Sequence, residues 1–214
     1  MYSVIASGVR STMAGRPVTY DRDAVVDGAM IEFWARGFTT SDVERLTQAA
    51  GLNRHSLYKS FGGKRGLFLE ALRRYVDEVA AAYVAMLESG TGLDDLLAYF
   101  ERISGAQGQA SDPAPQGFDH RGCFLVNTAI ELGRTDPDVA ALLDAYYARI
   151  EEGFAGLIRR GQVHGSIRGD LDPQITARWL RVTGQGLSVS SRIGAMPQDL
   201  AQMMRLTLTP MTTQ

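Results

Sequence analysis

The amino-acid sequence predicts an all-α protein. Apolar residues recur at spacings of three and four residues along most of the chain, as they do on the buried face of a helix. No segment shows the alternation of apolar and polar residues that is typical of a half-buried strand. Two pairs, Asp136-Pro137 and Asp172-Pro173, each combine a capping side chain with a proline at the first helical position. Long helices are therefore expected to follow both pairs.

The first predicted helices lie near the N-terminus, after residues 1–20, which show no periodic pattern and are expected to be a flexible arm. Asp21 is placed to cap a helix that runs to about Arg36. A short second helix is expected to have Ser41 as its cap. It should stop at Gly51, because glycine accepts the left-handed conformation at low cost.

A third helix is predicted from Asn53, which is placed to cap it, to about Phe61. Leu57 and Phe61 are four residues apart and are expected to point toward the core. The other side chains form an outer face that is rich in hydrogen-bond donors and almost free of acid: Arg54, His55, Ser56, Tyr58, Lys59 and Ser60. A helix, a tight turn with glycine and a second helix with such a face can enter the major groove of DNA.

Motif residues continue before and after the two helices. They are the stretch from Trp34 to Phe38, Ala50-Gly51-Leu52, Ser56-Leu57-Tyr58, Phe61, Lys64 and Leu67-Phe68. On these residues, the segment 21–75 closely resembles the DNA-binding domain of the TetR family of bacterial transcriptional regulators, of the AcrR-like type. The sequence departs from the family at Ser60, where His or Tyr is usual, and at His55, where a small residue or Pro is frequent. Both departures bear on which operator sequence is read.

The resemblance implies a homodimeric regulator, most simply a repressor that an unidentified small-molecule effector releases from double-stranded operator DNA. It assigns Tyr58 to phosphate contacts, and the position of Lys64 at a helix start also favours a phosphate, a solvated lysine being the alternative. Arg54, His55 and Ser56 are better placed for base edges. The full predicted DNA-binding set is Thr40, Ser41, Asn53, Arg54, His55, Ser56, Tyr58, Lys59 and Lys64.

The segment from Met13 to Pro17 is similar to the beginning of many family members, which implies that residues 1–12 are an over-long start. Gly15-Arg16-Pro17 would also allow an arginine to lie in an adjacent minor groove, as homeodomain arms do. A plain disordered tail is the alternative interpretation of the arm.

The charge distribution is consistent with a DNA-binding N-terminal part. Residues 1–75 hold 11 Lys and Arg against 7 Asp and Glu, a net charge of +4, whereas residues 76–214 hold 11 against 17, a net charge of −6. A basic module joined to an acidic remainder confines phosphate attraction to one part of the chain. Uneven surface charge by chance is the alternative.

A helix without a breaker is predicted from Lys64 to about Glu88. At ~1.5 Å per residue it would be on the order of 35 Å long. It would join the helix-turn-helix DNA-binding domain (21–66) to a larger helical ligand-binding and dimerisation domain (67–214). Further helices are expected over 93–103 and 123–132, from Asp136 to Gly161 or Gly165, from Asp172 to about Ser191, and after Pro197, with a loop over 111–120.

An effector pocket is implied by the resemblance, and buried polar groups among aromatic residues are its candidates. Those residues are Phe100, Phe124, Asn127, Thr128, Glu131, Tyr146 and Trp179, together with Tyr147. Ordinary core packing is the alternative for each of them. The last two helices are candidates for the dimer interface, because Gly184, Gly186 and Ser188 permit close approach and Trp179, Leu180, Leu187, Met203 and Met204 supply apolar area.

Two other functions were weighed against an effector-released repressor. Cys123 follows Arg121 at a predicted helix start, where a lowered thiol pKa would suit a redox- or electrophile-sensing repressor; a small buried residue is the alternative. A small-molecule enzyme would need Cys123, His120 or His164, and Asp119 as a nucleophilic set. No strand-turn-helix elbow or phosphate loop supports that set, so catalysis is not expected.

The composition excludes several further classes. No apolar run reaches the ~18 residues of a membrane span, and Val4-Ile5-Ala6 is too short for a signal-peptide core. A single cysteine excludes an intramolecular disulfide framework, and the three histidines lack ligand spacing, so neither a metal nor a cofactor is expected. A cytoplasmic protein without membrane contact is the expectation.

Overall fold

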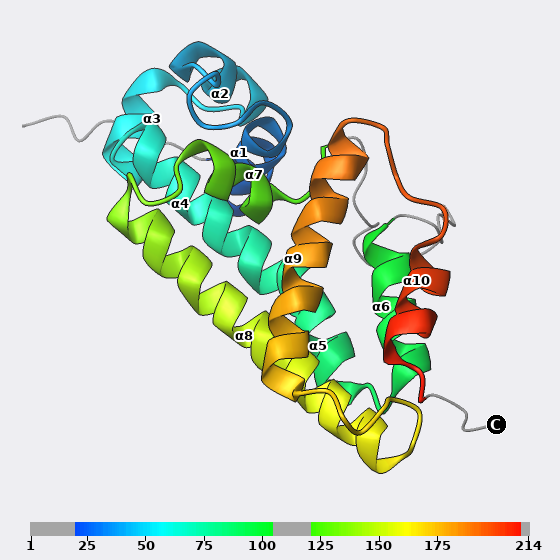
Figure 1. Ribbon diagram of the computed structural model, residues 1–214. Coiled ribbons are helices and arrows are strands. Elements are labelled where there is room, and N and C mark those ends of the chain that lie inside the picture. The colour runs from blue at the N-terminus through cyan, green and yellow to red at the C-terminus, as the bar shows by residue number, and fades with distance from the viewer. Residues whose placement is uncertain (1–19, 105–120, 211–214) are drawn as a thin grey trace, which may run out of the picture.

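The computed structural model describes residues 20–104 and 121–210, and every regular element within these ranges is a helix (Figure 1). The all-α prediction is therefore confirmed for the described chain. The elements are α1 (Arg22–Arg36), α2 (Val43–Ala49), α3 (Arg54–Phe61), α4 (Lys64–Arg74), the π-helical segment η1 (Tyr75–Ala80), α5 (Ala81–Ser89), α6 (Leu93–Ile103), α7 (Phe124–Glu131), α8 (Pro137–Val163), α9 (Pro173–Arg192) and α10 (Leu200–Leu208). The predictions for residues 1–19 and for the 111–120 loop concern residues outside the described ranges.

Most predicted capping residues occupy the positions that the sequence assigned. Asp21 accepts hydrogen bonds from the backbone of the first turn of α1, and Asn53 Oδ1 accepts one from Ser56 N at 2.8 Å. Asp136 and Asp172 do the same for α8 and α9, each with proline at the helix start. These side chains satisfy backbone N–H groups that have no partner inside their helix.

The cap of α2 was predicted wrongly. Asp42, not Ser41, caps this helix, and its carboxylate accepts from Arg45 N at 2.8 Å. Ser41 is fully buried, and its hydroxyl donates to the carbonyl of Gly37 at 2.7 Å. The serine therefore fixes the connection between α1 and α2 instead of the start of α2.

The predicted 64–88 helix is continuous but not uniform. Its middle part, Tyr75–Ala80, is π-helical and lies between the regular helices α4 and α5. A π segment inserts an extra residue per turn, and such segments are frequent at functional positions. The helix therefore links the two parts of the molecule with an irregular turn at the junction.

Two hydrophobic cores divide the molecule. The first contains the buried faces of α1 to α4 and continues through α7 into the start of α8, with Phe68 packed edge-on against both Phe33 and Phe124. The second is formed by α5, α6, α9, α10 and the remainder of α8. Val79 and Tyr146 pack against both cores. α7 is thus a helix of the C-terminal part that packs on the N-terminal head.

No helix in residues 20–104 or 121–210 is both long and apolar enough to cross a membrane. The head with α2 and α3 lies at one end of the elongated molecule, and α6, α9 and α10 lie toward the other (Figure 1). α8 runs along one side and joins the two ends.

Candidate nucleic-acid interface

The α2-turn-α3 unit is held by a small buried face. Gly51 adopts a φ of 60°, and the following Leu52 turns inward, with 7% of its surface exposed. Leu46 and Leu57 are fully buried beneath the two helices. On the far side of α3, a Cβ atom on Gly66 would lie 1.7 Å from the carbonyl oxygen of Phe61, so only glycine permits this close approach of α3 and α4. Packing at the turn, beneath the two helices and against α4 therefore determines which side of α3 faces solvent.

That outer face is open and carries donors without competing partners. Arg54, His55 and Lys59 are exposed, and Tyr58 is 52% exposed. In the part of the chain that the structure describes, Arg54 and Lys59 form no ion pair. Several other cations of the head are paired with carboxylates, such as Arg22 with Glu70 at 2.5 Å. α3 thus carries two cations without an ion-pair partner among the described residues.

Two neighbouring arginines of the head have structural partners instead. Arg65 binds the Asp136 carboxylate with two nitrogens at 2.8 Å and also contacts Asp138 at 2.7 Å. Hydrogen bonds that Arg65 donates to these two carboxylates raise the pKa of Arg65, and the same contact lowers the pKa of Asp136. Arg74 contacts Asp27 at 3.1 Å and Asp23. These cations join α4 to α8 and α1.

The expectation that Ser56 faces outward is wrong. Its side chain is 2% exposed, and its hydroxyl has no hydrogen-bond partner among the described residues. The buried stripe of α3 is wider than the Leu57 and Phe61 pair, because Ser56 lies beside Leu57 on the helix surface. Of the three residues expected at base edges, Arg54 and His55 are exposed.

The remaining members of the predicted DNA-binding set lie in different settings. Thr40 is exposed and donates its hydroxyl to the carbonyl of Arg36. Asn53 is exposed and uses its oxygen as the α3 cap. Lys64 is half-buried, with Nζ 4.5 Å from the centre of the Phe38 ring and 3.4 Å from the carbonyl oxygen of Thr39. Its ammonium group thus covers the α1–α2 connection.

The predicted effector residues do not line one cavity. Phe100 belongs to the second core and Phe124 to the first, while Tyr146 packs against both. Thr128 is buried, and its hydroxyl has no partner among the described residues. Trp179 is 40% exposed on the outside of α9. The sequence could not assign these residues to two cores, because their helical spacing is the same in both.

The polar candidates of α7 also have other partners. Asn127 Nδ2 donates to the carbonyl of Arg121 at 2.7 Å. Glu131 is exposed at the end of α7, where its oxygens accept from Phe38 N at 2.7 Å and Thr39 N at 2.5 Å. Ile130, on the same helix, is 71% exposed. The helix is half-covered because it packs on the head with one side only.

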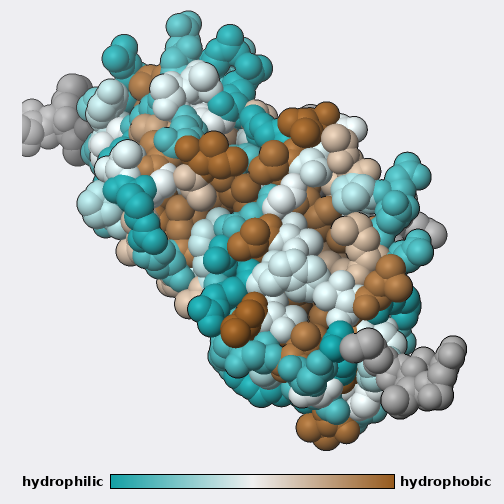
Figure 2. Space-filling model, in the orientation of Figure 1, coloured by the Kyte–Doolittle hydropathy of each residue, from teal (hydrophilic) through white to brown (hydrophobic). Residues whose placement is uncertain are grey.

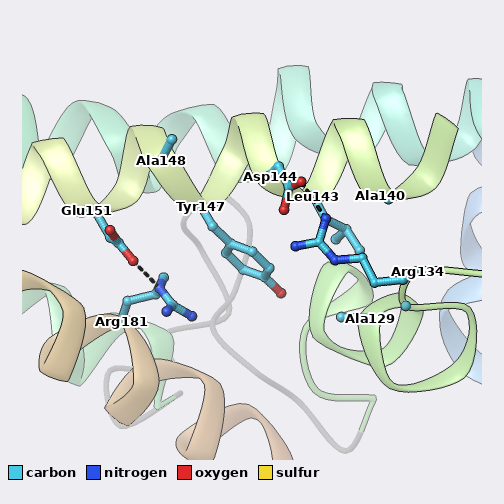
Figure 3. A pocket seen from close by; sticks show the side chains of 10 residues that line it. Ala129, Arg134, Ala140, Leu143, Asp144, Tyr147, Ala148, Glu151 and Arg181 are labelled. Atoms are coloured by element: carbon cyan, nitrogen blue, oxygen red, sulfur yellow. Dashed lines mark hydrogen bonds and ion pairs between the residues drawn. The ribbon is translucent and has the colours of Figure 1, made fainter. Parts of the chain in front are cut away.

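A groove of about 570 Å³ does exist between α7, α8 and α9 (Figure 3). Two ion pairs cross it, Arg134 with Asp144 at 2.5 Å and Arg181 with Glu151 at 2.6 Å. The other lining residues are Ala129, Gly133, Ala140, Leu143, Tyr147 and Ala148. Only Tyr147 among them was a sequence candidate. The missed signal is a face of small and charged residues at helical spacing along α8, which a search for buried aromatic residues passes over.

Cys123 does not have the environment that sensing would require. The thiol is buried, and burial raises its pKa, so the prediction of a lowered pKa is wrong. Tyr75 Oη lies 3.6 Å from Sγ and donates to it. His164 lies beside the carbonyl of Thr91, and Asp119 and His120 lie outside the described residues. Within the described ranges, no three His, Cys, Asp or Glu side chains gather as a metal site would require.

The two helical cores and the exposed, donor-rich α3 place this protein in the class of helix-turn-helix DNA-binding proteins. The family model "Bacterial regulatory proteins, tetR family" matches residues 25–71, and "Tetracyclin repressor-like, C-terminal domain" matches residues 92–207. The chain belongs to the TetR family, and it is a DNA-binding regulator of transcription.

Individual relatives agree with this assignment. The chain is 33% identical over 196 residues to the HTH-type transcriptional repressor ComR of Escherichia coli (strain K12), with 91% of this chain and 90% of that protein covered. It is 31% identical over 191 residues to the HTH-type transcriptional repressor BdcR of the same strain, with 89% of each covered. Its structure is similar to the TetR family transcriptional regulator CifR, in a cysteine mutant complexed with 26bp double-strand operator DNA. That match has a TM-score of 0.70 and 28% identity, and covers 90% of this chain and 97% of that chain.

Proposed function

We propose that the protein is a homodimeric repressor that binds operator DNA through α3 and leaves it when a small molecule binds the C-terminal domain. The observation that carries the proposal is the open face of α3, on which Arg54 and Lys59 have no ion-pair partner in the described chain. Such a protein acts in the cytoplasm, where operator DNA is found, and needs neither catalysis nor a cofactor.

On this proposal the exposed side chains of the head divide into two roles. Arg54 and His55, in the first turn of α3, face the base edges, and a guanidinium is suited to a bidentate contact with guanine. Tyr58 and Lys59 lie further along the helix and bind phosphates, as does Thr40 at the end of the α1–α2 connection. Lys64 reaches a phosphate only if it leaves the Phe38 ring.

The dimer is proposed to form through the outer face of α9 and α10. Apolar side chains are exposed along these helices, and apolar patches are visible over α9 (Figure 2). The exposed apolar residues are Ile175, Trp179, Val182, Val189, Ile193, Met203 and Leu206. Three residues named from the sequence, Leu180, Leu187 and Met204, are instead buried within the protomer. A second copy would cover the exposed set, and pairing two heads supplies the affinity that a single helix-turn-helix lacks.

The groove between α7, α8 and α9 is the proposed effector site. Its volume of about 570 Å³ is in the range of small-molecule sites. An occupant would contact α7, which packs on the DNA-binding head, and α9, which carries the proposed dimer face. The groove thus touches both elements that a released state must move.

The proposal is tested by selection of DNA from a randomised duplex pool of about 30 base pairs, long enough for two half-sites one helical turn apart. The expected result is enrichment of an inverted repeat whose half-sites are roughly 34–36 Å apart, or more if the dimer spans further. Sedimentation of the complex should give two protomers per duplex. Recovery of the unselected pool with no enriched sequence would overturn the proposal.

A further inference from the structure

A carboxylate of the C-terminal domain holds the connection that leads into the helix-turn-helix. Glu131, the last residue of α7, accepts hydrogen bonds from two successive backbone N–H groups, those of Phe38 and Thr39, at 2.7 and 2.5 Å. The two residues are 93 and 92 positions away in sequence and belong to neither α1 nor α2. Hydrogen bonds that involve an ionised acceptor are about twice as strong as neutral ones.

The surroundings of this contact are shaped for a carboxylate. Gly37 has a φ of 86°, and a Cβ atom on it would lie 2.6 Å from Glu131 Oε2, so the absent side chain leaves the space that the carboxylate fills. Lys64 lies over the Phe38 ring and on the carbonyl of Thr39. Burial alone would raise the pKa of Glu131, but the hydrogen bonds from Thr39 and Phe38 and the charge of Lys64 outweigh it and lower the pKa. Glu131 is therefore ionised at neutral pH.

The other end of α7 is also fixed to the head. Trp34 Nε1 donates to the carbonyl of Gly122 at 2.8 Å, in a buried contact just before the helix. On the opposite side, Ser188 of α9 accepts from Cys123 N at 2.7 Å. Helix α7 therefore contacts the end of α1 through Trp34 and the residues after α1 through Glu131. A movement of α7 cannot leave the head unchanged.

The connection held by Glu131 leads directly into α2. After Thr39 the chain passes through Ser41, whose hydroxyl donates to Gly37, and then reaches Asp42, the cap of α2. We propose that Glu131 is a positioning residue through which the C-terminal domain sets the orientation of the helix-turn-helix for operator binding. This inference rests on the proposed function. Glu131 would also link the groove to the head, because Ala129 and Gly133, on either side of Glu131, line the groove.

The test compares Glu131→Ala and Glu131→Gln with wild type, using the duplex that wild type enriches from the randomised pool. Glu88→Ala is the matched control, because it removes one exposed carboxylate from the far end of α5, where Glu88 pairs with Arg149 only at 3.9 Å. Glu131→Ala should weaken binding to the selected duplex by about tenfold or more, a size typical of coupling between sites. Glu131→Gln keeps one acceptor and should fall between Glu131→Ala and wild type.

Two further readouts separate positioning from a loss of fold. Binding to an unselected duplex and sedimentation as a dimer should be the same in Glu131→Ala and wild type, because the charges of α3 and the outer face of α9 remain. Hydrogen exchange should become faster at Phe38 and Thr39 and stay unchanged inside α1. The inference is overturned if Glu131→Ala binds the selected duplex like wild type, or if both duplexes are lost together as the head unfolds. If wild type selects no sequence, the proposed function fails, and unchanged exchange at Phe38 and Thr39 would then overturn the inference separately.

Discussion

The helices α3 and α9 each leave one long face uncovered, and the two faces have opposite chemistry. α3 exposes Arg54, His55 and Lys59, polar side chains that solvate well and need no cover. α9 exposes Ile175 and Val182, at 63% and 54%, with further apolar residues along the same helix. Scattered exposed apolar side chains are ordinary, whereas a row of them along one helix marks an interface.

The difference in polarity between the two faces indicates what kind of partner each face can bind. The polar face of α3 is stable in water without a partner. Its selectivity for a partner can come only from the positions of its hydrogen-bond donors. The apolar face of α9 is unfavourable in water. Covering it would lower the free energy by roughly 25 cal/mol for each Å² of apolar surface removed from solvent. On the proposed function, DNA binding depends on both, since α3 would supply the contacts and α9 would bring in the second copy of α3.

The largest expected effect comes from a charge on the apolar face. Val182→Arg should abolish the dimer, because an arginine buried without a partner costs several kcal/mol. Operator affinity should fall by more than about 100-fold, since each protomer would then bind alone. Sedimentation and binding to the selected duplex measure the two effects. Leu187→Arg, at a residue that the sequence named for the interface, would instead test folding, because Leu187 is 4% exposed within the protomer.

Ala145→Arg is the control for Val182→Arg, since Ala145 is exposed on α8, away from α9. It should sediment as a dimer and bind like wild type. If Val182→Arg also remained a dimer with normal affinity, the comparison of the two faces would fail, and the interface would lie elsewhere.

A smaller effect should separate reading from positioning on α3. Arg54→Ala should cost about 1–3 kcal/mol on the preferred operator and relax the base preference at one position of each half-site. Lys59→Ala should weaken all sequences alike and reduce the salt dependence by about one charge per half-site. Repeating the selection with each variant, and titrating at several salt concentrations, measures both. A uniform loss of affinity in Arg54→Ala would reassign that residue to the phosphates.

The two helices can also be compared through their caps. Asn53→Ala on α3 and Asp172→Ala on α9 each remove one cap that accepts a backbone N–H at 2.8 Å, so each should lower the free energy of unfolding by about 1 kcal/mol. Operator affinity should fall in Asn53→Ala alone, because α3 is the helix proposed to contact the DNA. Urea unfolding and binding titrations provide the two quantities. Asn53→Ser retains a cap and should restore both; failure to do so would indicate that Asn53 itself contacts the DNA.

The sequence was most informative where the cause of a structure lies within a few residues. The caps Asp21, Asn53, Asp136 and Asp172 act on the turn that follows each of them, and all were predicted. Ser41 was expected to cap α2, but the next residue, Asp42, does so. Ser56 was assigned to the outer face because only Leu57 and Phe61 were taken as the buried side of α3.

The effector region could be predicted far less well, because its partners are distant in sequence. Glu131 carries no local sign that it binds residues 92 and 93 positions earlier. Phe100 of α6 and Phe124 of α7 are both apolar residues of amphipathic or apolar segments, yet they lie in different cores. The groove was missed because charged side chains such as Arg134 and Asp144 resemble an ordinary solvated surface until the fold places them opposite each other.

The smallest expected effect concerns Cys123, which neither exposed face contains. Burial raises the pKa of this thiol above its ordinary value of 9.0, so at pH 7 it holds less of the reactive thiolate than an exposed cysteine does. Iodoacetamide should therefore modify the folded protein slowly at pH 7 and faster as the pH rises through 9, with rapid reaction at pH 7 only in urea.

Treatment of the dimer with hydrogen peroxide at neutral pH should likewise leave affinity for the selected duplex unchanged, as should Cys123→Ala. The thiol lies on Tyr75 Oη at the first core, and Cys123 N is bonded to Ser188 of α9. Oxidation there would disturb both the head and the dimer face if it occurred, so the measurement is sensitive. Loss of operator binding on mild oxidation in wild type, but not in Cys123→Ala, would show that the buried thiol is reached and would restore the sensing alternative.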